Sequence, residues 1–301
     1  MGTAPGVDAT YNYMDEIWRL SLGENADISN ALYADDYSKT LEQAQRDKHE
    51  YILNHVCFAP GHRVLDVGCG WGGFLRTVQK RWGRGVGLTV STKQARTCWR
   101  SGLEVYLRDW KDVDANTFGP FDAVVSVGAF EHFCSEEEYA AGLQDEIYLR
   151  FFALCHDVLS AGGRLFLQTM TWGKRVPQPT AISLQARKGS DEYILAVLRR
   201  FYSASGWLPA GVDHIAKVAR RHFRVVLVDN GRLDYIKTME EWGKRINRPS
   251  PAKLVVLARM LRYLLVDRDC IYRVRSYLHG YNQECFRQQI MDHYRMVLER
   301  V

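Results

Sequence analysis

Residues 64–73, VLDVGCGWGG, decide the fold because they join a buried strand to a glycine-rich turn and then to a helix. Val64 and Leu65 are apolar and β-favouring, and a helical pattern begins at Phe74, directly after the glycines. Glycine lets the backbone pass close to a ligand. In an open parallel sheet, ligands bind beyond the carboxyl ends of the strands, where a strand hands over to a helix. The stretch therefore predicts a cofactor-binding turn.

The spacing of the glycines is compatible with two classes of cofactor. Gly68, Gly70 and Gly73 fit the Gly-x-Gly-x-x-Gly pattern of dinucleotide sites. Such sites carry an acidic residue about 20 residues further on. That residue is missing here, because the next strand-like run ends in residues 87–91, GLTVS. Asp66 instead precedes the glycines, and Asp-x-Gly-x-Gly after a strand is the pattern of S-adenosylmethionine-dependent methyltransferases. We therefore expect S-adenosylmethionine as the cofactor.

The composition is that of a globular protein. The chain has 301 residues, of which 47% are hydrophobic and 25% charged, and no run reaches the ~18 apolar residues of a membrane span. The first residues lack an apolar signal segment, so a cytoplasmic location is expected. A net charge of +5 is too small to indicate a nucleic-acid partner. The seven cysteines form no Cys-x-x-Cys pair, so neither a metal site nor a disulfide framework is expected.

Strand candidates alternate with helical patterns after the glycine turn, which predicts a parallel α/β layout. The candidates are residues 84–91, 103–110, 121–128 and 163–169. Residues 122–127, DAVVSV, have the apolar character of a central strand and deliver Glu131 and His132 to its carboxyl end. Glu131 is a candidate general base or anion anchor. The alternative is a carboxylate that only interacts with a helix dipole.

Residues 10–58 predict helices that precede the sheet and cover the cofactor. An aromatic helix is expected around Trp18, and a second helix begins after Thr40, an N-cap with Gln43 in the capping-box position. Between them, residues 27–33 have the small and polar character of a loop.

Three segments together resemble the cyclopropane-fatty-acid synthase and mycolic-acid methyltransferase family. They are DVGCGWG at 66–72, GLTVS at 87–91 followed by Gln94, and SVGAFEHF at 126–133. Residues 41–45 with Lys48, and residues 201–209, 234–238 and 277–280, also resemble family segments in order, so the resemblance covers most of the chain. Only the spacer near residues 245–270 is longer than expected.

The resemblance implies a Rossmann-like, seven-stranded methyltransferase sheet with inserted helices that form an apolar substrate tunnel. Residues 223–228 and 294–298 would supply the last two strands. The implied division is a helical cover at 1–58, a cofactor-binding core at 59–172, an inserted helical lid at 173–214 and 240–275, and the remainder of the core sheet at 215–239 and 276–301.

The resemblance also implies which residues bind the cofactor. Gly68 and Gly70 would approach its methionine part, and Ser29 would close over its carboxylate end. Thr89 and Gln94 would take the ribose. The full expected set is Ser29, Asp66, Gly68, Gly70, Thr89, Gln94, Asp109, Trp110 and His132, with Trp110 beside Asp109 at the adenine.

The chemistry that the family implies is attack of an alkene on the sulfonium methyl group, followed by loss of a proton from a carbocation. Family members commonly hold a bicarbonate as the base, using a Glu, a His, a Tyr and groups near a Cys. Glu131 and Tyr235 match this pattern, but Gln168 stands at the His position and Asn30 at the Cys position. Glutamine cannot be protonated, so it offers an anion no charge. Either Glu131 holds an anion or water together with Gln168 and Tyr235, or Glu131 itself takes the proton.

The expected substrate is an anionic, unsaturated, lipid-like molecule. Residues 240–275 contain nine basic and four acidic residues, in a segment whose apolar helix also suits a membrane surface. The alternative is a solvated basic face over a packed apolar one. A prenyl diphosphate is the preferred prediction, since arginine matches phosphate oxygens. The candidate substrate contacts are Trp172, Phe201, Tyr202, Trp207, Arg259, Arg262 and Arg273.

Two further hypotheses remain at this point. The first is an unsaturated fatty-acyl or mycolic-type chain as the substrate of a cyclopropane synthase or methyltransferase. The second is a cofactor-binding subunit without catalysis, against which the intact Glu131 and Tyr235 argue. The oligomeric state does not follow from the sequence.

Overall fold

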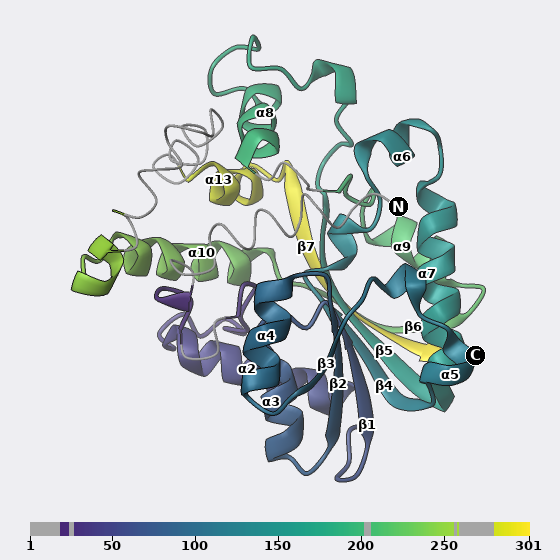
Figure 1. Ribbon diagram of the computed structural model, residues 1–301. Coiled ribbons are helices and arrows are strands. Elements are labelled where there is room, and N and C mark those ends of the chain that lie inside the picture. The colour runs from purple at the N-terminus through teal and green to yellow at the C-terminus, as the bar shows by residue number, and fades with distance from the viewer. Residues whose placement is uncertain (1–18, 24–26, 202–205, 256–257, 259–279) are drawn as a thin grey trace.

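The computed structural model describes residues 19–23, 27–201, 206–255, 258 and 280–301 (Figure 1). The helices lie at α2 Leu41–His55, α3 Gly73–Lys80, α4 Thr92–Arg100, α5 Ala115–Phe118, α6 Glu136–Ala140, α7 Gln144–Val158, α8 Asp191–Phe201, α9 Val212–Ala219, α10 Arg232–Asn247 and α13 Tyr281–Arg287. Short 3-10 turns lie at Trp110–Asp112, Phe130–His132 and Pro179–Ala181. The strands are β1 Arg63–Val67, β2 Arg84–Thr89, β3 Glu104–Leu107, β4 Phe121–Val127, β5 Leu159–Trp172, β6 Phe223–Asn230 and β7 Met291–Arg300.

The seven strands form one sheet in the order β3-β2-β1-β4-β5-β7-β6. Strands β1 to β5 pair in parallel, whereas β7 is antiparallel to both neighbours and lies between β5 and β6. In this register Gln168 lies opposite Arg295 and Met170 opposite His293. The last strand of the chain therefore carries its own polar residues beside the carboxyl end of β5.

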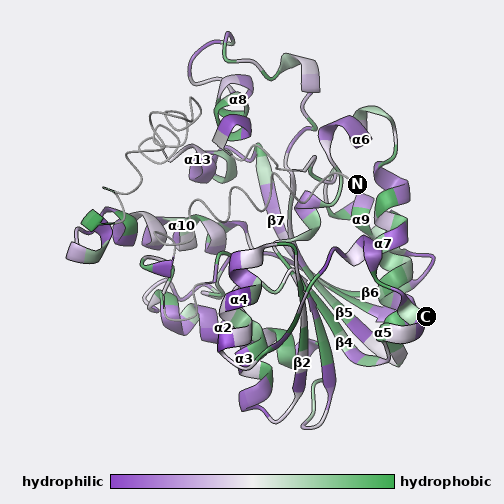
Figure 2. Ribbon diagram, in the orientation of Figure 1, coloured by the Kyte–Doolittle hydropathy of each residue, from purple (hydrophilic) through white to green (hydrophobic). Residues whose placement is uncertain are grey.

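Helices cover both faces of the sheet and one end of it. Figure 1 shows α2, α3 and α4 on one side and α5, α7 and α9 on the other, with α8, α10 and α13 gathered beyond the strands. The strands are mostly apolar and the outward surfaces of the helices polar (Figure 2). A sheet buried on both faces needs such near-continuous apolar strands.

Two of the helix starts show why the chain turns where it does. The Thr40 hydroxyl accepts a hydrogen bond from the Gln43 amide at 3.2 Å, which caps α2 as the sequence predicts. At α4 the Ser91 side chain accepts from the Gln94 amide at 3.4 Å. The Ser91 cap holds polar side chains next to the carboxyl end of β2.

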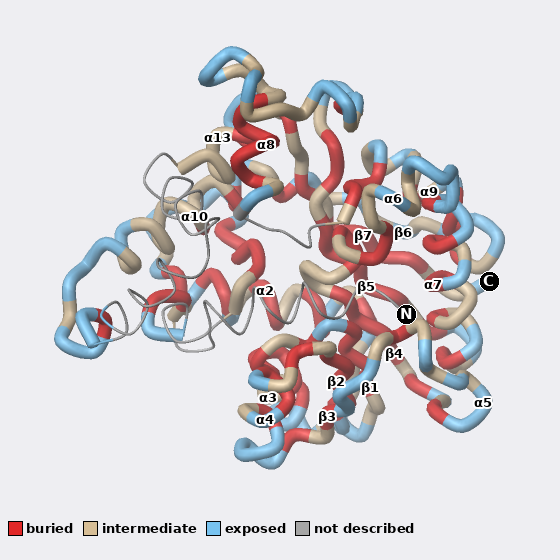
Figure 3. Tube along the Cα trace, turned by 45° about the horizontal axis from the view of Figure 1, so that its top comes forward, coloured by how far each residue is buried: buried red, intermediate tan, exposed pale blue. Residues whose placement is uncertain are grey.

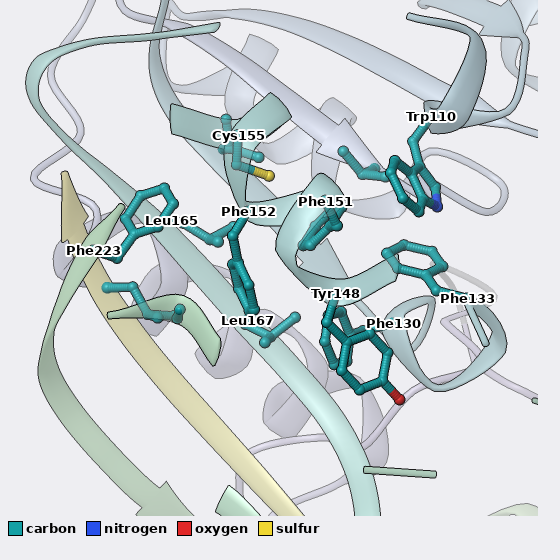
Figure 4. Close-up of a cluster of buried hydrophobic side chains, with 14 of the residues drawn as sticks. Trp110, Phe130, Phe133, Tyr148, Phe151, Phe152, Cys155, Leu165, Leu167 and Phe223 are labelled. Carbon is teal, nitrogen blue, oxygen red and sulfur yellow. The ribbon is translucent and has the colours of Figure 1, made fainter. Parts of the chain in front are cut away.

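The largest hydrophobic cluster packs α7 against β4 and β5. Figure 4 shows Phe151 and Phe152 between Trp110 and Phe223, with Phe130 and Tyr148 nearby. Ring centroids of Phe130 and Tyr148 are 4.3 Å apart. Phe130 of this cluster lies in the same short turn as Glu131, so the cluster holds that turn in place. The strands are mostly buried (Figure 3). The site is therefore built on a rigid part of the sheet.

The sheet confirms the predicted α/β fold, and all seven expected strands are present. The third strand is shorter than predicted, since β3 ends at Leu107 and a 3-10 turn starts at Trp110. The cause is the Asp109 carboxylate, which accepts from the Lys111 amide at 3.0 Å and caps that turn.

Two of the predicted boundaries between parts of the chain fall inside helices. The predicted boundary between core and lid at 239/240 falls inside α10, which is continuous, and that at 214/215 falls inside α9. The predicted aromatic helix around Trp18 lies outside the described residues, as do residues 202–205, 256–257 and 259–275 of the predicted lid. No helix among the described residues is long and apolar enough to cross a membrane.

Candidate active site

A pocket opens where β1, β2 and β4 end, and the glycine turn forms its floor. Gly68 has φ +88°, and a β-carbon added there would lie 2.4 Å from the β-carbon of Ala129. Gly70 has φ +54° and faces open space, with no atom within 4 Å of the corresponding position. Only glycine adopts such conformations freely. The turn thus leaves room for a ligand above Gly70 while it packs tightly against the turn after β4.

All nine residues expected to bind the cofactor line this pocket. These nine residues come from five parts of the chain, among them Ser29 in the N-terminal loop and His132 in the turn after β4. His132 is half-buried, and its buried Nδ1 has no hydrogen-bond partner in the described structure. Burial lowers the pKa of His132 to about 4, so it is neutral at physiological pH.

One wall of the pocket is a buried charge cluster. Asp27 accepts from Lys48 Nζ at 3.1 Å and lies 2.8 Å from His49 Nε2. Lys48 also donates to the Ser29 hydroxyl at 2.7 Å. These contacts hold the pKa of Asp27 well below its usual value, although burial opposes them. Burial, followed by the charge of Asp27, raises the pKa of Asp66 to about 7.

Another part of the lining comes from the end of β2 and the segment after β3. The Thr89 hydroxyl donates to Gln94 Oε1 at 2.8 Å and accepts from the Ser91 amide at 3.2 Å. Trp110 stands next to Asp109 and packs on Phe133, with ring centroids 5.0 Å apart. This part of the lining therefore combines fixed polar groups with a broad aromatic surface.

Glu131 lies just behind the pocket wall and is 5% exposed. Its Oε2 accepts from the Thr169 hydroxyl at 2.9 Å, and its Oε1 is 3.8 Å from the place where a side chain at Gly128 would begin. Gly128 and Ser29 both line the pocket. Burial raises the pKa of Glu131 to about 7, while hydrogen bonds from its backbone and from Thr169 lower it. The carboxyl group is therefore poised between its two protonation states near neutral pH.

The other three predicted catalytic residues lie near β5 and β7, where Gln168 directly precedes Thr169, the residue that contacts Glu131. Gln168 is buried and donates from Nε2 to the Asn30 carbonyl oxygen at 3.1 Å. The side chain of Asn30 turns toward β7 and contacts His293. Tyr235 on α10 packs beside the same histidine, with ring centroids 5.0 Å apart. The structure thus brings Asn30, Gln168 and Tyr235 into one neighbourhood through His293.

The predicted substrate contacts fall into two groups. Trp172 and Trp207 are buried with ring centroids 5.0 Å apart, in an apolar cluster that also includes Tyr235. Phe201 ends α8, but its side chain lies outside the described structure. Tyr202, Arg259, Arg262 and Arg273 also lie outside it.

Sequence reasoning missed several residues that the structure brings to this region. Asp27, Lys48 and His49 line the pocket, and only Lys48 carried a signal, as part of a family-like segment. His293 and Thr169 gave no signal. His293 lies on the last strand, far in sequence from the motifs it joins.

The geometry can be compared with that of known proteins. The family model described as mycolic acid cyclopropane synthetase matches residues 3–296. The chain belongs to this family. A curated relative, cyclopropane mycolic acid synthase 3 of Mycobacterium tuberculosis, is 28% identical over 309 residues, which cover 98% of this chain and 96% of that protein. The crystal structure of a mycolic acid cyclopropane synthase complexed with SAH and CTAB matches with a TM-score of 0.76 and 28% identity, over 99% of this chain and 98% of that one.

Membership in the family establishes the class of reaction. The protein is an S-adenosylmethionine-dependent methyltransferase of the mycolic acid cyclopropane synthase group, and S-adenosylmethionine is its cofactor. A geranyl diphosphate C-methyltransferase from Streptomyces coelicolor has a TM-score of 0.59 at 14% identity, over 100% of this chain and 99% of that one. That likeness concerns the fold alone. The preferred prediction of a prenyl diphosphate substrate therefore gains no support, and the acyl-chain alternative fits the family better.

Proposed function

We propose that this enzyme transfers a methyl group from S-adenosylmethionine to a double-bond carbon of an unsaturated acyl chain, with Glu131 at the point of delivery. The observation that carries the proposal is the position of the buried carboxyl group of Glu131 directly behind the pocket wall at Gly128, where burial raises its pKa to about 7. Methylation of an alkene creates positive charge on carbon that is resolved by loss of a proton, and this requires a base in an apolar setting.

The pocket residues fit the cofactor in their chemistry. Bound S-adenosylmethionine supplies an electrophilic methyl group. Lys48 and Ser29 offer hydrogen-bond donors for its carboxylate end, and the buried carboxyl group of Asp66 suits its ammonium group. Open space above Gly70 admits the ligand close to the backbone. Trp110 offers an aromatic face beside the Thr89–Gln94 pair.

An acyl chain suits the described part of the lid better than a diphosphate does. Lys244 pairs with Glu241 at 2.8 Å, and Arg245 pairs with Glu42. Lys253 donates to the carbonyl oxygens of Ile246 and Arg248. These cations are thus satisfied within the protein. The neighbouring aromatic cluster of Trp172, Trp207 and Tyr235 is apolar, as an acyl chain requires.

The test is incubation of the purified protein with S-adenosylmethionine carrying a deuterated methyl group and with unsaturated acyl lipids, followed by mass spectrometry. We expect incorporation of the labelled carbon into the chain. The olefinic signals in the NMR spectrum then separate a ring, which removes the double bond, from a plain methylated alkene, which keeps it. Geranyl diphosphate is the competing substrate in the same assay, and its exclusive methylation would overturn the acyl assignment.

Glu131→Gln provides the matched variant for the site. It keeps the size and shape of the side chain but cannot accept a proton as a carboxylate does. Turnover should fall by about 10²–10⁴-fold, the range of a general base, while S-adenosylhomocysteine binding measured by calorimetry stays at the wild-type affinity. Normal turnover in this variant would show that Glu131 has no part in the reaction.

A further inference from the structure

Two buried cysteines meet beside the glycine turn of the cofactor pocket. Cys69 lies in the turn after β1, and Cys98 lies on α4. The Sγ atom of Cys69 is 3.9 Å from the Gly70 carbonyl oxygen, and the Sγ atom of Cys98 is 3.5 Å from the same oxygen. The two thiols also share a hydrogen bond. The fold thus pairs two cysteines that belong to no common sequence motif.

The surroundings leave space for the two sulfur atoms and little else. A β-carbon added at Gly87 would lie 2.6 Å from Cys69 Sγ, and one added at Gly72 would lie 3.1 Å from Cys98 Sγ. The pair belongs to a buried apolar cluster with Leu75, Leu103 and Val105. Because close packing restricts side chains to few rotamers, the two sulfur atoms are held next to each other.

The hydrogen bond between the thiols makes one of them the better acid. A hydrogen bond from Cys69 lowers the pKa of the Cys98 thiol, and the positive charge of Arg76 lowers it further, although burial opposes both. The same hydrogen bond, together with burial, raises the pKa of Cys69 well above its usual value. Burial alone raises the pKa of Cys155 well above its usual value. Since the thiolate is the nucleophile, Cys98 is more reactive toward oxidants than a buried cysteine such as Cys155.

The cofactor pocket gives a small oxidant access to the pair. Cys69 lines this pocket and is 7% exposed, whereas Cys98 is fully buried. Both neighbours of Cys69 in the chain, Gly68 and Gly70, line the pocket as well. A cofactor bound over these glycines covers the turn. The pair is therefore accessible when the pocket is empty and protected when the cofactor is bound.

We propose that Cys69 and Cys98 form a reversible oxidation site, in which hydrogen peroxide joins them in a disulfide that weakens binding of S-adenosylmethionine. One sulfur attacks the peroxide, keeps one oxygen as a sulfenic acid and releases the other as water. The second sulfur then displaces this oxygen, which leaves as a second water when the S–S bond forms. Two thiols and one peroxide thus give one disulfide and two waters, and two electrons pass from sulfur to oxygen. A small dithiol reverses the oxidation by thiol–disulfide exchange.

The disulfide acts on the pocket from two sides. Cys69 stands between Gly68 and Gly70, the glycines that form the pocket floor. Gln94, which lines the pocket, precedes Cys98 by four residues and so lies on the same face of α4. A disulfide brings two sulfur atoms much closer than a hydrogen bond between thiols does. The glycine turn and α4 must therefore approach each other, which displaces both the floor and Gln94.

Oxidation and cofactor binding oppose each other by the same factor. If the disulfide weakens the binding of S-adenosylhomocysteine, this ligand must shift the equilibrium between dithiol and disulfide toward the dithiol to the same extent. Coupling between two sites in a protein is typically about 5–150-fold. This reciprocity distinguishes a site coupled to the pocket from a pair of cysteines that is oxidised without consequence.

Mass spectrometry of the full-length protein, treated with hydrogen peroxide and then digested, tests the pairing. The peptides that contain Cys69 and Cys98 should be linked to each other, and dithiothreitol should release them. Cys98→Ser removes the partner but keeps a hydrogen-bond donor for the Gly70 carbonyl oxygen, and Cys98→Ala serves as a second variant. Cys57→Ser, which removes an exposed thiol, is the matched control and should keep the link. Oxidation of Cys57 without a link between Cys69 and Cys98 would refute the proposal.

Calorimetry with S-adenosylhomocysteine tests the effect on the pocket. The Kd should rise by about 5–150-fold on oxidation and return to its first value after dithiothreitol, whereas peroxide should not change the Kd of Cys98→Ser. In a glutathione redox buffer, saturating S-adenosylhomocysteine should raise the dithiol-to-disulfide ratio by the same factor. An unchanged Kd in the linked protein, or a ratio that ignores the ligand, would overturn the proposal. No acyl substrate enters these measurements, so their outcome is independent of the proposed function.

Discussion

Substitution of Gly68 by alanine tests how the glycine turn shapes the cofactor pocket. Gly68 has φ +88°, and an added β-carbon would lie 2.4 Å from the β-carbon of Ala129. Non-bonded carbons sit about 3.5–4.0 Å apart, so one of the two turns must move. A left-handed conformation costs an alanine roughly 1–2 kcal/mol, and overpacking adds typically about 1–3 kcal/mol. Gly68→Ala should therefore lose about 2–5 kcal/mol of unfolding free energy.

The two contributions to this loss of unfolding free energy, the steric contact and the backbone conformation, can be measured separately. Ala129→Gly removes the β-carbon that the new side chain would meet. In this background, Gly68→Ala should therefore lose only the unfolding free energy that the left-handed backbone conformation costs, without the overpacking cost. Gly70→Ala is the matched control, because φ is +54° and nothing lies within 4 Å. It should lose only roughly 1–2 kcal/mol, while its methyl group stands over the pocket and weakens S-adenosylhomocysteine binding.

Urea unfolding without cofactor gives the stabilities, and calorimetry gives the affinities. If the urea midpoint of Gly68→Ala equals that of the wild type, the claim that the two turns pack closely at Gly68 and Ala129 is refuted. If Ala129→Gly recovers nothing in the double variant, the loss arises from the backbone conformation rather than from the contact.

Two further predictions concern buried charge. Because burial raises the pKa of Asp66 from 3.8 to about 7, its contribution to stability is full below the unfolded pKa and is lost as the pH rises through the folded one. Asp66→Asn should therefore flatten the fall in unfolding free energy between about pH 4 and pH 7, and an unchanged slope in urea titrations would contradict this. Arg295→Met leaves Asp229 and Asp234 unpaired and should cost about 3–5 kcal/mol. Arg224→Met, whose side chain is 70% exposed, should leave the urea midpoint nearly unchanged, and equal effects of the two substitutions would refute the assignment of a buried ion pair.

Short-range patterns were enough to predict the first five strands, whereas the last two followed from the family resemblance. Each strand carries its own apolar run, and the turn at residues 68–73 follows from glycine spacing, so neither needs knowledge of distant contacts. The end of β3 was missed because a side-chain cap at Asp109 competes with an apolar run that continues to Trp110. The choice of an acyl chain over a diphosphate depended on family membership, since basic residues in a helix do not reveal which partners they already have.

The sequence by itself determined the glycine turn and the parallel strands, because these follow one another within single strand–turn–helix units, and the family resemblance indicated nine of the residues that line the cofactor pocket. Only the tertiary structure decided the surroundings of Glu131. The antiparallel β7 inserts between β5 and β6 and carries His293 and Arg295 to Asn30 and Gln168, more than 120 residues away in sequence. The protonation of a buried group and the direction of its hydrogen bonds depend on such neighbours. Whether an anion binds near Glu131 therefore depends on the tertiary structure.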